Sequence, residues 1–289
     1  MKPAAFDYHA PQTLDEALDL MARYGDEAKV LAGGQSLVPA MNFRLAQPAV
    51  LVDLNRIEGL SAIRADDEGL RIGAMARQRA VERSPQVAEQ APLVTEALPS
   101  VAHPQIRNRA TFGGSIAHAD PAAELPAVAR ALGARLRLSS VRGERWVEAD
   151  DFFTGLFETA LEADEILTEV LVPRRPEHEG WAFEEVARRH GDYAMVGVAV
   201  VVSLGADGRL TRPAIGLLSV GDGPVRATSA EQALEGLPAT AESFDAAAEA
   251  VASALDPPSD LHASSDYRRH LARVLTRRLL GRAVERARP

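Results

Sequence analysis

The segment Lys29-Val30-Leu31-Ala32-Gly33-Gly34-Gln35-Ser36-Leu37 is a short apolar strand that runs directly into two glycines and a serine. Without Cβ atoms, neighbouring glycines let backbone N–H groups converge on one point. Such a group of amides suits phosphate oxygens, and the Ser36 hydroxyl can add a donor. The pattern is neither Gly-x-Gly-x-x-Gly nor a P-loop. Taken alone, a tight turn is the simpler explanation.

A second glycine pair followed by a serine, in Thr111-Phe112-Gly113-Gly114-Ser115, begins 80 residues after Gly33. Thr111 and Ser115 carry hydroxyls that could donate to a diphosphate. Two glycine-rich segments of matching type are more specific than one. Together they predict a diphosphate held from both sides, as in a dinucleotide that lies between two lobes.

The residues around this second stretch are predicted to form one irregular loop from 103 to 120, and a long loop in a compact domain is usually functional. His118 and Asp120 lie where they could meet hydroxyl groups of a sugar or ribityl chain. His118 could equally be a helix-entry residue. Asp120 is predicted to be the N-cap of a helix from Pro121 to Leu132, because proline suits a first helical turn.

Tyr193, in Gly191-Asp192-Tyr193-Ala194, stands where a polar segment becomes an apolar one. Its ring could stack on a flat heteroaromatic group, which is favourable by about 1 kcal/mol. A hairpin turn with Tyr193 as the first residue of a strand is the simpler alternative.

Composition excludes several classes of function. The 289 residues include 32 basic and 41 acidic side chains, a formal charge of −9 that disfavours general nucleic-acid binding. There are no cysteines, so the chain holds no disulfide and no thiolate-ligated cluster or zinc. No histidine spacing suits a metal, and no apolar run approaches a membrane span or a signal peptide. A cytoplasmic location is therefore expected.

Local patterns predict the order of elements. Thr13 and Glu16 form a capping box for a helix over 13–24. Proline at 85 and 92 interrupts a mostly helical segment over 75–103. Strands are expected at 29–32, 50–54, 70–74, 135–138, 145–147, 166–172, 193–204 and 210–220, and further helices at 229–255 and 265–286. Eight arginines in 268–288 predict a solvated helix face or a docking face for an acidic partner.

Together these segments resemble the FAD-binding medium subunit of molybdenum hydroxylases, the carbon monoxide dehydrogenase and xanthine dehydrogenase family. The resemblance covers essentially the whole chain. It rests mainly on Ala32-Gly33-Gly34-Gln35-Ser36-Leu37 and on the segment 106–124, which reads Ile-Arg-Asn-Arg-Ala-Thr-Phe-Gly-Gly-Ser-Ile-Ala-His-Ala-Asp-Pro-Ala-Ala-Glu. Gly191-Asp192-Tyr193-Ala194 is similar to the family segment that faces the flavin, and 267–272 is similar to the family's C-terminal domain.

The resemblance implies an α+β fold: a two-lobed FAD-binding domain of the PCMH-like type, then a small α/β domain with a three- or four-stranded antiparallel sheet. The expected units are 1–57, 58–175 and 176–289. The amides of 33–36 and 113–115 would hold the diphosphate, Asp120 or Glu124 would meet ribityl or ribose hydroxyls, and Tyr193 would cover the isoalloxazine. The full set of expected FAD-binding residues is Ala32, Gly33, Gly34, Gln35, Ser36, Leu37, Thr111, Gly113, Gly114, Ser115, Ala117, His118, Asp120, Glu124, Ile166, Leu167 and Tyr193.

The resemblance also implies partners. The molybdenum cofactor would sit on a large subunit and [2Fe-2S] clusters on a small one, in a dimer of heterotrimers. Electrons would pass through FAD to an external acceptor, so the chain needs no catalytic acid–base pair of its own. Asn42 stands where many relatives have a basic residue. The lack of cysteine disfavours the branch that reduces aromatic CoA thioesters.

Two other functions stay open at this point. A stand-alone flavin reductase or oxidase on a related fold would need its own proton donor beside the flavin, and no residue in the sequence stands out as such a donor. A scaffold protein that has lost FAD binding would not need two intact glycine pairs.

Overall fold

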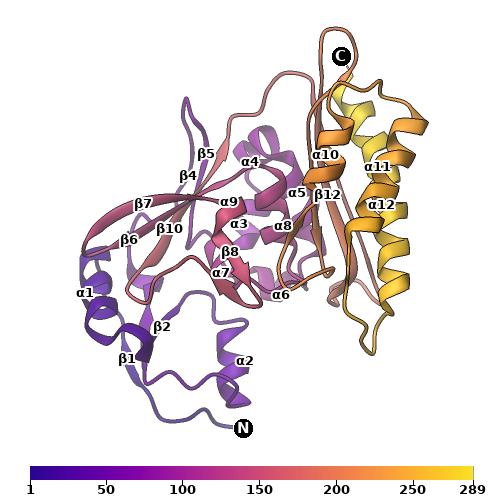
Figure 1. Ribbon diagram of the computed structural model, residues 1–289. Coiled ribbons are helices and arrows are strands. Elements are labelled where there is room, and N and C mark those ends of the chain that lie inside the picture. Colours follow the sequence, from indigo (N-terminus) through magenta and orange to yellow (C-terminus); the bar gives the residue numbers. More distant parts are fainter. Residues whose placement is uncertain (289) are drawn as a thin grey trace.

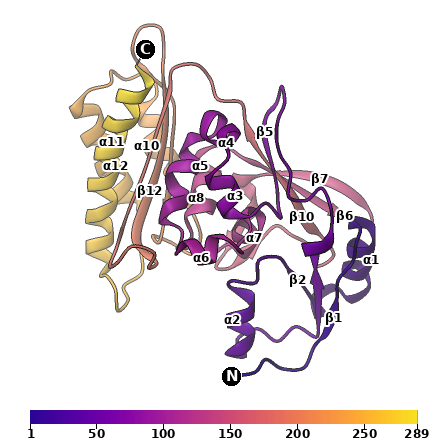
Figure 2. The same ribbon diagram turned by 180° about the vertical axis from the view of Figure 1, so that it is seen from behind.

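The computed structural model describes residues 1–288 and contains three larger β-sheets (Figures 1 and 2). Their strands come from residues 7–53, 63–173 and 179–226. This architecture confirms the predicted α+β fold and its antiparallel C-terminal sheet. The expected units 1–57, 58–175 and 176–289 stay a prediction. Among residues 1–288, no helix combines the length and the apolarity needed to cross a lipid bilayer.

The N-terminal sheet is parallel, with the strand order β1-β3-β2. Thr13 caps α1 as predicted by accepting a hydrogen bond from the Glu16 N–H (3.2 Å), while the Glu16 carboxylate accepts from the Gln12 N–H (2.8 Å). Met75 and Ile166, from the next part of the chain, complete the core of this sheet. The elements are β1 (Asp7–His9), α1 (Leu14–Tyr24), β2 (Ala28–Leu31), α2 (Leu37–Asn42) and β3 (Val50–Asp53).

The second sheet is antiparallel, with the strand order β4-β5-β10-β6-β7. The strands expected at 135–138 and 145–147 are present and pair with each other, and the strand expected at 166–172 is present as well. The strands are β4 (Ile63–Ala65), β5 (Gly69–Gly73), β6 (Arg135–Ser140), β7 (Gly143–Glu148) and β10 (Ile166–Pro173), and β8 (Phe153–Gly155) pairs with β9 (Glu158–Thr159) in a small hairpin.

Short helices lie between this sheet and the C-terminal sheet (Figures 1 and 2). Pro85 and Pro92 each begin a helix, so the predicted interruptions are confirmed. The helices are α3 (Gln78–Glu82), α4 (Pro85–Gln90), α5 (Pro92–Ala97), α6 (Pro104–Arg107), α7 (Phe112–His118), α8 (Glu124–Ala131) and α9 (Ala149–Phe152).

The C-terminal sheet is antiparallel, with the strand order β11-β12-β13-β14. One face packs against α5 and α8, and α10–α12 cover the other face (Figure 1). Gly216 permits a close approach, because a Cβ there would lie 2.4 Å from the Ala127 carbonyl oxygen of α8. The elements are β11 (Glu179–Ala187), β12 (Ala194–Leu204), β13 (Leu210–Leu218), β14 (Val225–Arg226), α10 (Thr228–Leu234), α11 (Ala241–Ala254) and α12 (Ser265–Ala287).

Three sequence predictions were wrong. The segment 103–120 is not one irregular loop, because it contains α6 and α7. The helix expected from Pro121 begins at Glu124, and the Asp120 carboxylate instead accepts the Ala122 N–H (2.9 Å) within a turn. The helix expected over 229–255 is two helices, because Gly236, with φ +75°, ends the first before Pro238.

The prediction of a docking face on α12 for an acidic partner is not supported, because acids of the same chain neutralise its arginines. Arg278 and Arg282 pair with Glu184, and Arg282 and Arg286 pair with Glu96. Arg268 is buried and donates to the carbonyl oxygen of Ser219 (3.0 Å). These charges therefore join α12 to β11 and α5 of the same chain.

Candidate functional site

The two glycine segments meet in the structure. A Cβ on Gly33 would lie 2.4 Å from the Arg109 carbonyl oxygen and 2.7 Å from the Ala110 Cα. A Cβ on Gly114 would lie 3.5 Å from the Ala32 Cβ. Only glycine therefore lets the backbone of the first segment approach the second so closely.

The first segment has unused backbone donors. Within residues 1–288, the N–H groups of 33–37 donate no hydrogen bond to another part of the chain. All five residues are at least partly exposed. Gly34 has φ +72°, a conformation that side chains disfavour and that turns successive amides toward one side. These amides fit an anionic diphosphate.

The second segment is a helical turn whose amides are already used. The Gly113 N–H donates to the Ala74 carbonyl oxygen (2.9 Å), and the Ser115 N–H donates to the Thr111 carbonyl oxygen (3.2 Å). The Gly114 N–H donates to the Thr111 hydroxyl (3.0 Å), which caps α7. The expected role of the 113–115 amides as diphosphate donors is therefore not supported here. The partly exposed Ser115 keeps its hydroxyl for a ligand.

A chain of polar side chains, none of which was predicted as a site residue, holds the two segments together. The Asn55 amide donates to the Ala32 carbonyl oxygen (2.9 Å) and accepts from Arg77 (2.6 Å). The Arg77 guanidinium also donates to the Arg109 carbonyl oxygen. Asp53 accepts from both Asn55 and Tyr8. The one available signal was the position of Asp53 and Asn55 at the end of the strand that neighbours the glycine segment.

A second group of predicted residues gathers around Asp120. Desolvation, followed by the negative charge of Asp120, raises the pKa of Tyr193. The Tyr193 side chain is otherwise 73% exposed and is free to cover a flat ligand. Burial raises the pKa of Glu124 to about 7. The His118 ring lies 5.2 Å from the Phe157 ring, between centroids, and burial lowers the pKa of His118.

Ile166 and Leu167 begin β10, and their side chains are buried in two different cores. β5 pairs with β10 only from Glu169 onward, so residues 166 and 167 of β10 have no β5 residue paired with them. The Ala74 N–H donates to the Thr168 carbonyl oxygen (2.9 Å), and the Ala74 carbonyl oxygen accepts from the Gly113 N–H. Ala74 therefore connects this part of β10 to the second glycine segment. The main chain of 166–167 therefore stays a candidate for cofactor contact.

Comparison with known families identifies the fold. The FAD binding domain in molybdopterin dehydrogenase matches residues 4–175, and the CO dehydrogenase flavoprotein C-terminal domain matches residues 181–283. The chain belongs to this flavoprotein family. Its cofactor is FAD, and the fit is visible in the close approach at Gly33 and in the unused amides of 33–37.

Proteins similar to this flavoprotein belong to enzymes that are named for different substrates. The 6-hydroxypseudooxynicotine dehydrogenase complex subunit alpha of Paenarthrobacter nicotinovorans is 43% identical over 100% of this chain and 98% of its own. The caffeine dehydrogenase subunit beta of Pseudomonas sp. (strain CBB1) is 41% identical over 99% and 97%. A solved carbon monoxide dehydrogenase from Hydrogenophaga pseudoflava, which lacks the Mo-pyranopterin moiety, superposes with a TM-score of 0.96 at 41% identity, covering 99% of each chain.

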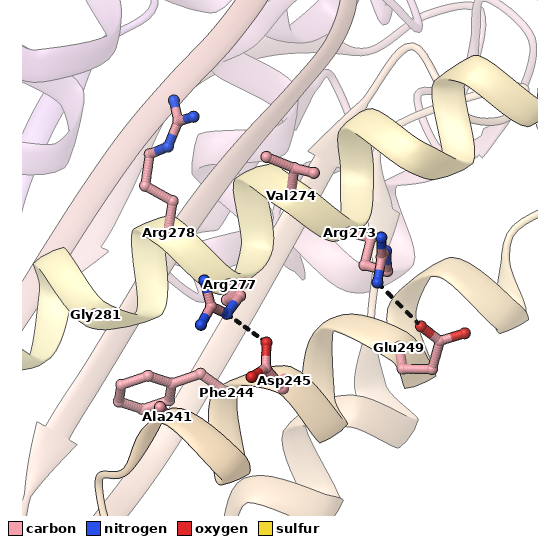
Figure 3. A pocket seen from close by; sticks show the side chains of 9 residues that line it. All are labelled: Ala241, Phe244, Asp245, Glu249, Arg273, Val274, Arg277, Arg278 and Gly281. Carbon is pink, nitrogen blue, oxygen red and sulfur yellow. Dashed lines mark ion pairs between the residues drawn. The ribbon is translucent and has the colours of Figure 1, made fainter.

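A groove of about 830 Å³ lies elsewhere in the flavoprotein, between α11 and α12 (Figure 3). Its arginines face acids across the groove: Arg277 pairs with Asp245, and Arg273 lies 3.8 Å from Glu249 between the charged atoms. None of the predicted FAD-binding residues lines this groove. The groove is therefore separate from the candidate flavin site.

Proposed function

We propose that this chain binds FAD between its two glycine segments and passes electrons from iron–sulfur clusters on a partner subunit to an external acceptor. The observation that carries the proposal is the set of unused amides at 33–37, held against the backbone of 109–110. Family membership supplies the identity of the cofactor and the class of complex. Bound FAD supplies the electron-carrying chemistry, and the protein supplies position and electrostatics.

The roles of individual residues are part of the proposal. The amides of 33–37 and the hydroxyls of Ser36 and Ser115 would contact the diphosphate. Asp120, which is only partly buried, would meet ribityl or ribose hydroxyls, and Tyr193 would cover the isoalloxazine. Thr111 and Gly113 would act indirectly, since they shape the helical turn that lies against Ala32. The other expected residues, Ala117, His118, Glu124, Ile166 and Leu167, would line the site.

The proposed partners are a large molybdenum-cofactor subunit and a small [2Fe-2S] subunit, arranged as a dimer of heterotrimers. Support comes from the relatives, which are named as subunits of dehydrogenases of a nicotine derivative and of caffeine. Because these relatives differ in substrate, we place the choice of substrate on the large subunit. A cytoplasmic location stays a prediction from sequence.

Flavin absorption tests the proposed cofactor site. The purified chain, or the chain after addition of FAD, is expected to show a flavin absorption band, with FAD released on denaturation and identified by mass. Gly33→Ala is expected to lose this band, whereas Gly281→Ala, where a Cβ meets open space, is expected to keep it. Equal FAD uptake by the two variants would contradict the assignment of the first segment.

Co-purification tests the proposed partners. The chain expressed with its large and small partners is expected to yield a complex that contains molybdenum, iron and FAD in fixed ratio. Rapid reaction with a reducing substrate should bleach the flavin band. A flavin-loaded chain that reduces acceptors without partners would instead favour a stand-alone reductase.

A further inference from the structure

Arg77 lies at the contact between the two glycine segments, and it was not among the residues expected to bind FAD. Its backbone is paired with the second segment, because Arg77 and Thr111 form an antiparallel bridge. The next residue continues this pairing, since the Gln78 N–H donates to the Ala110 carbonyl oxygen (2.9 Å). The main chain of Arg77 is therefore fixed against the segment that begins α7.

The guanidinium of Arg77 reaches toward the first segment. It donates to the Asn55 side-chain oxygen (2.6 Å), and the Asn55 amide donates to the Ala32 carbonyl oxygen (2.9 Å). It also donates to the Arg109 carbonyl oxygen. That same oxygen lies so close to Gly33 that a Cβ there would be 2.4 Å from it. The positive charge is therefore one hydrogen bond away from the backbone oxygen that Gly33 contacts.

The charge of Arg77 has no carboxylate partner. Two arginines that are close to it in sequence or structure, Arg79 and Arg107, both pair with Glu82 (2.8 and 3.0 Å). Within residues 1–288, by contrast, neither Arg77 nor Arg109 takes part in an ion pair. An arginine carries five N–H donors and stays protonated in proteins. Arg77 therefore keeps its charge, and it has donors beyond the two hydrogen bonds that it makes.

Asp53 is the acid whose charge acts on Arg77, but its carboxylate is already engaged. It accepts from the Tyr8 hydroxyl (2.5 Å) and from the Asn55 backbone N–H (2.9 Å). Desolvation, and then the charge of Arg109, lowers the pKa of Arg77, while Asp53 opposes this by a smaller amount. The contact between the segments thus carries an excess of positive charge in a chain whose formal charge is −9. Such a place favours an anion.

We propose that Arg77 supplies the positive charge that balances the diphosphate of FAD beside the unused amides of 33–37. This role rests on the proposed function, which places the diphosphate at the first segment. Hydrogen bonds from a guanidinium to phosphate are charge-assisted and stronger than neutral ones. The bonds to Asn55 and to the Arg109 backbone hold the guanidinium in place before the ligand arrives, so binding does not have to order a long side chain.

FAD affinity at two salt concentrations tests this role, because salt screens a charge interaction and does not screen a packing contact. The Debye length falls from about 30 Å at 0.01 M salt to about 3 Å at 1 M. Arg77→Gln in the full chain is expected to bind FAD about tenfold more weakly than wild type at 0.01 M salt. At 1 M salt the two should differ by less than about threefold. A difference that is equal at both concentrations would overturn the role of the charge.

Arg77→Lys separates the charge from the hydrogen bonds. Lysine keeps the positive charge but lacks the planar fork that reaches Asn55 and Arg109 together. At 0.01 M salt its FAD affinity is expected to lie between those of wild type and Arg77→Gln. Its affinity should depend on salt as steeply as that of wild type. A lysine variant with the weaker salt dependence of Arg77→Gln would show that the hydrogen bonds alone matter, and would overturn the proposal.

Two further variants are controls. Arg83→Gln removes the same charge from an exposed arginine directly after α3, the helix that Arg77 precedes, and it should bind FAD like wild type at both salt concentrations. Asn55→Ala loosens the contact between the segments without removing a charge, so it should weaken FAD binding by the same factor at both. A loss in Arg83→Gln equal to that in Arg77→Gln would indicate a general effect of net charge and would overturn the proposal.

The outcomes separate this proposal from the proposed function. A wild-type chain that binds no FAD, alone or in the co-expressed complex, would overturn both. A wild-type chain that binds FAD, together with an Arg77→Gln variant of equal affinity at 0.01 M salt, would overturn the role of Arg77 and leave the cofactor site standing. Arg77 is only partly buried, so both of its variants are expected to fold, and circular dichroism without FAD checks this.

Discussion

The two glycine segments, Gly33-Gly34-Gln35-Ser36 and Gly113-Gly114-Ser115, look alike in sequence, yet their backbone amides are used differently in the structure. The first, residues 33–37, has amides with no partner in the described chain. The second, residues 113–115, begins a helix, and each of its amides already has an acceptor. In both segments a glycine lets two pieces of backbone touch: Gly33 lies against 109–110, and Gly113 lies against Ala74. Only the first segment also has amides without an acceptor in the described chain, so hydrogen bonding distinguishes a candidate binding loop from a packing contact.

Gly33→Ala is expected to have the largest effect, because its Cβ would overlap the backbone of 109–110 rather than a flexible side chain. We expect the free energy of unfolding to fall by about 3 kcal/mol, the upper part of the range for overpacked sites. FAD affinity should fall at least about tenfold, which corresponds to about 1.4 kcal/mol. Urea unfolding and FAD titration measure the two effects.

The matched control for Gly33→Ala is Gly281→Ala in α12, where no atom lies within 4 Å of the added Cβ. It should stabilise the helix by up to about 1 kcal/mol. A Gly33→Ala chain as stable as wild type would show that the two segments are not held in contact.

Asn55→Ala is expected to have an intermediate effect, because it removes the side chain that links Ala32 to Arg77. Loss of these hydrogen bonds should lower the free energy of unfolding by about 1.5 kcal/mol. FAD affinity should fall as well, since the first segment loses its anchor to the second. Thermal unfolding with and without FAD would show both changes.

The exposed Asn108 provides a control for Asn55, since Asn108→Ala should change stability by less than about 0.5 kcal/mol. If both alanine variants behave alike, the Asn55 bridge contributes nothing to holding the segments.

Thr111→Val is expected to have the smallest effect, and it tests the difference between the segments directly. The variant removes the hydroxyl that caps α7, which should lower the free energy of unfolding by about 1 kcal/mol. FAD affinity should fall less than in Gly33→Ala, because the freed Gly114 amide was not a ligand donor. Thr111→Ser keeps the cap and should behave like wild type. A larger loss of affinity in Thr111→Val than in Gly33→Ala would reverse the roles assigned to the two segments.

Sequence predicted the fold well wherever one local pattern decided the structure. The capping box at Thr13, the prolines that begin α4 and α5, and the strand ended by Pro173 all follow from short-range chemistry. Predictions failed where a short helix lacks the usual periodicity. The segment 103–120 contains two helices of four and seven residues, too short to show an apolar stripe.

For the candidate site, sequence identified the residue types but not their hydrogen bonds. Nothing local shows that the Gly113 amide is used by Ala74 or that Asn55 reaches Ala32, because both contacts join distant parts of the chain.

The position of α12 has a consequence for the order of events during synthesis. Val196, Val198, Val200 and Val202 lie in the core beneath this helix, on the face of β12 turned away from α8. The ribosome releases β12 before it has made residues 265–287, so this row of valines emerges without its cover. A nascent chain that stalls before α12 would expose an apolar β-sheet surface, and such surfaces promote aggregation. Synthesis of α12 (Ser265–Ala287) is thus the step that turns an aggregation-prone intermediate into a subunit ready for assembly.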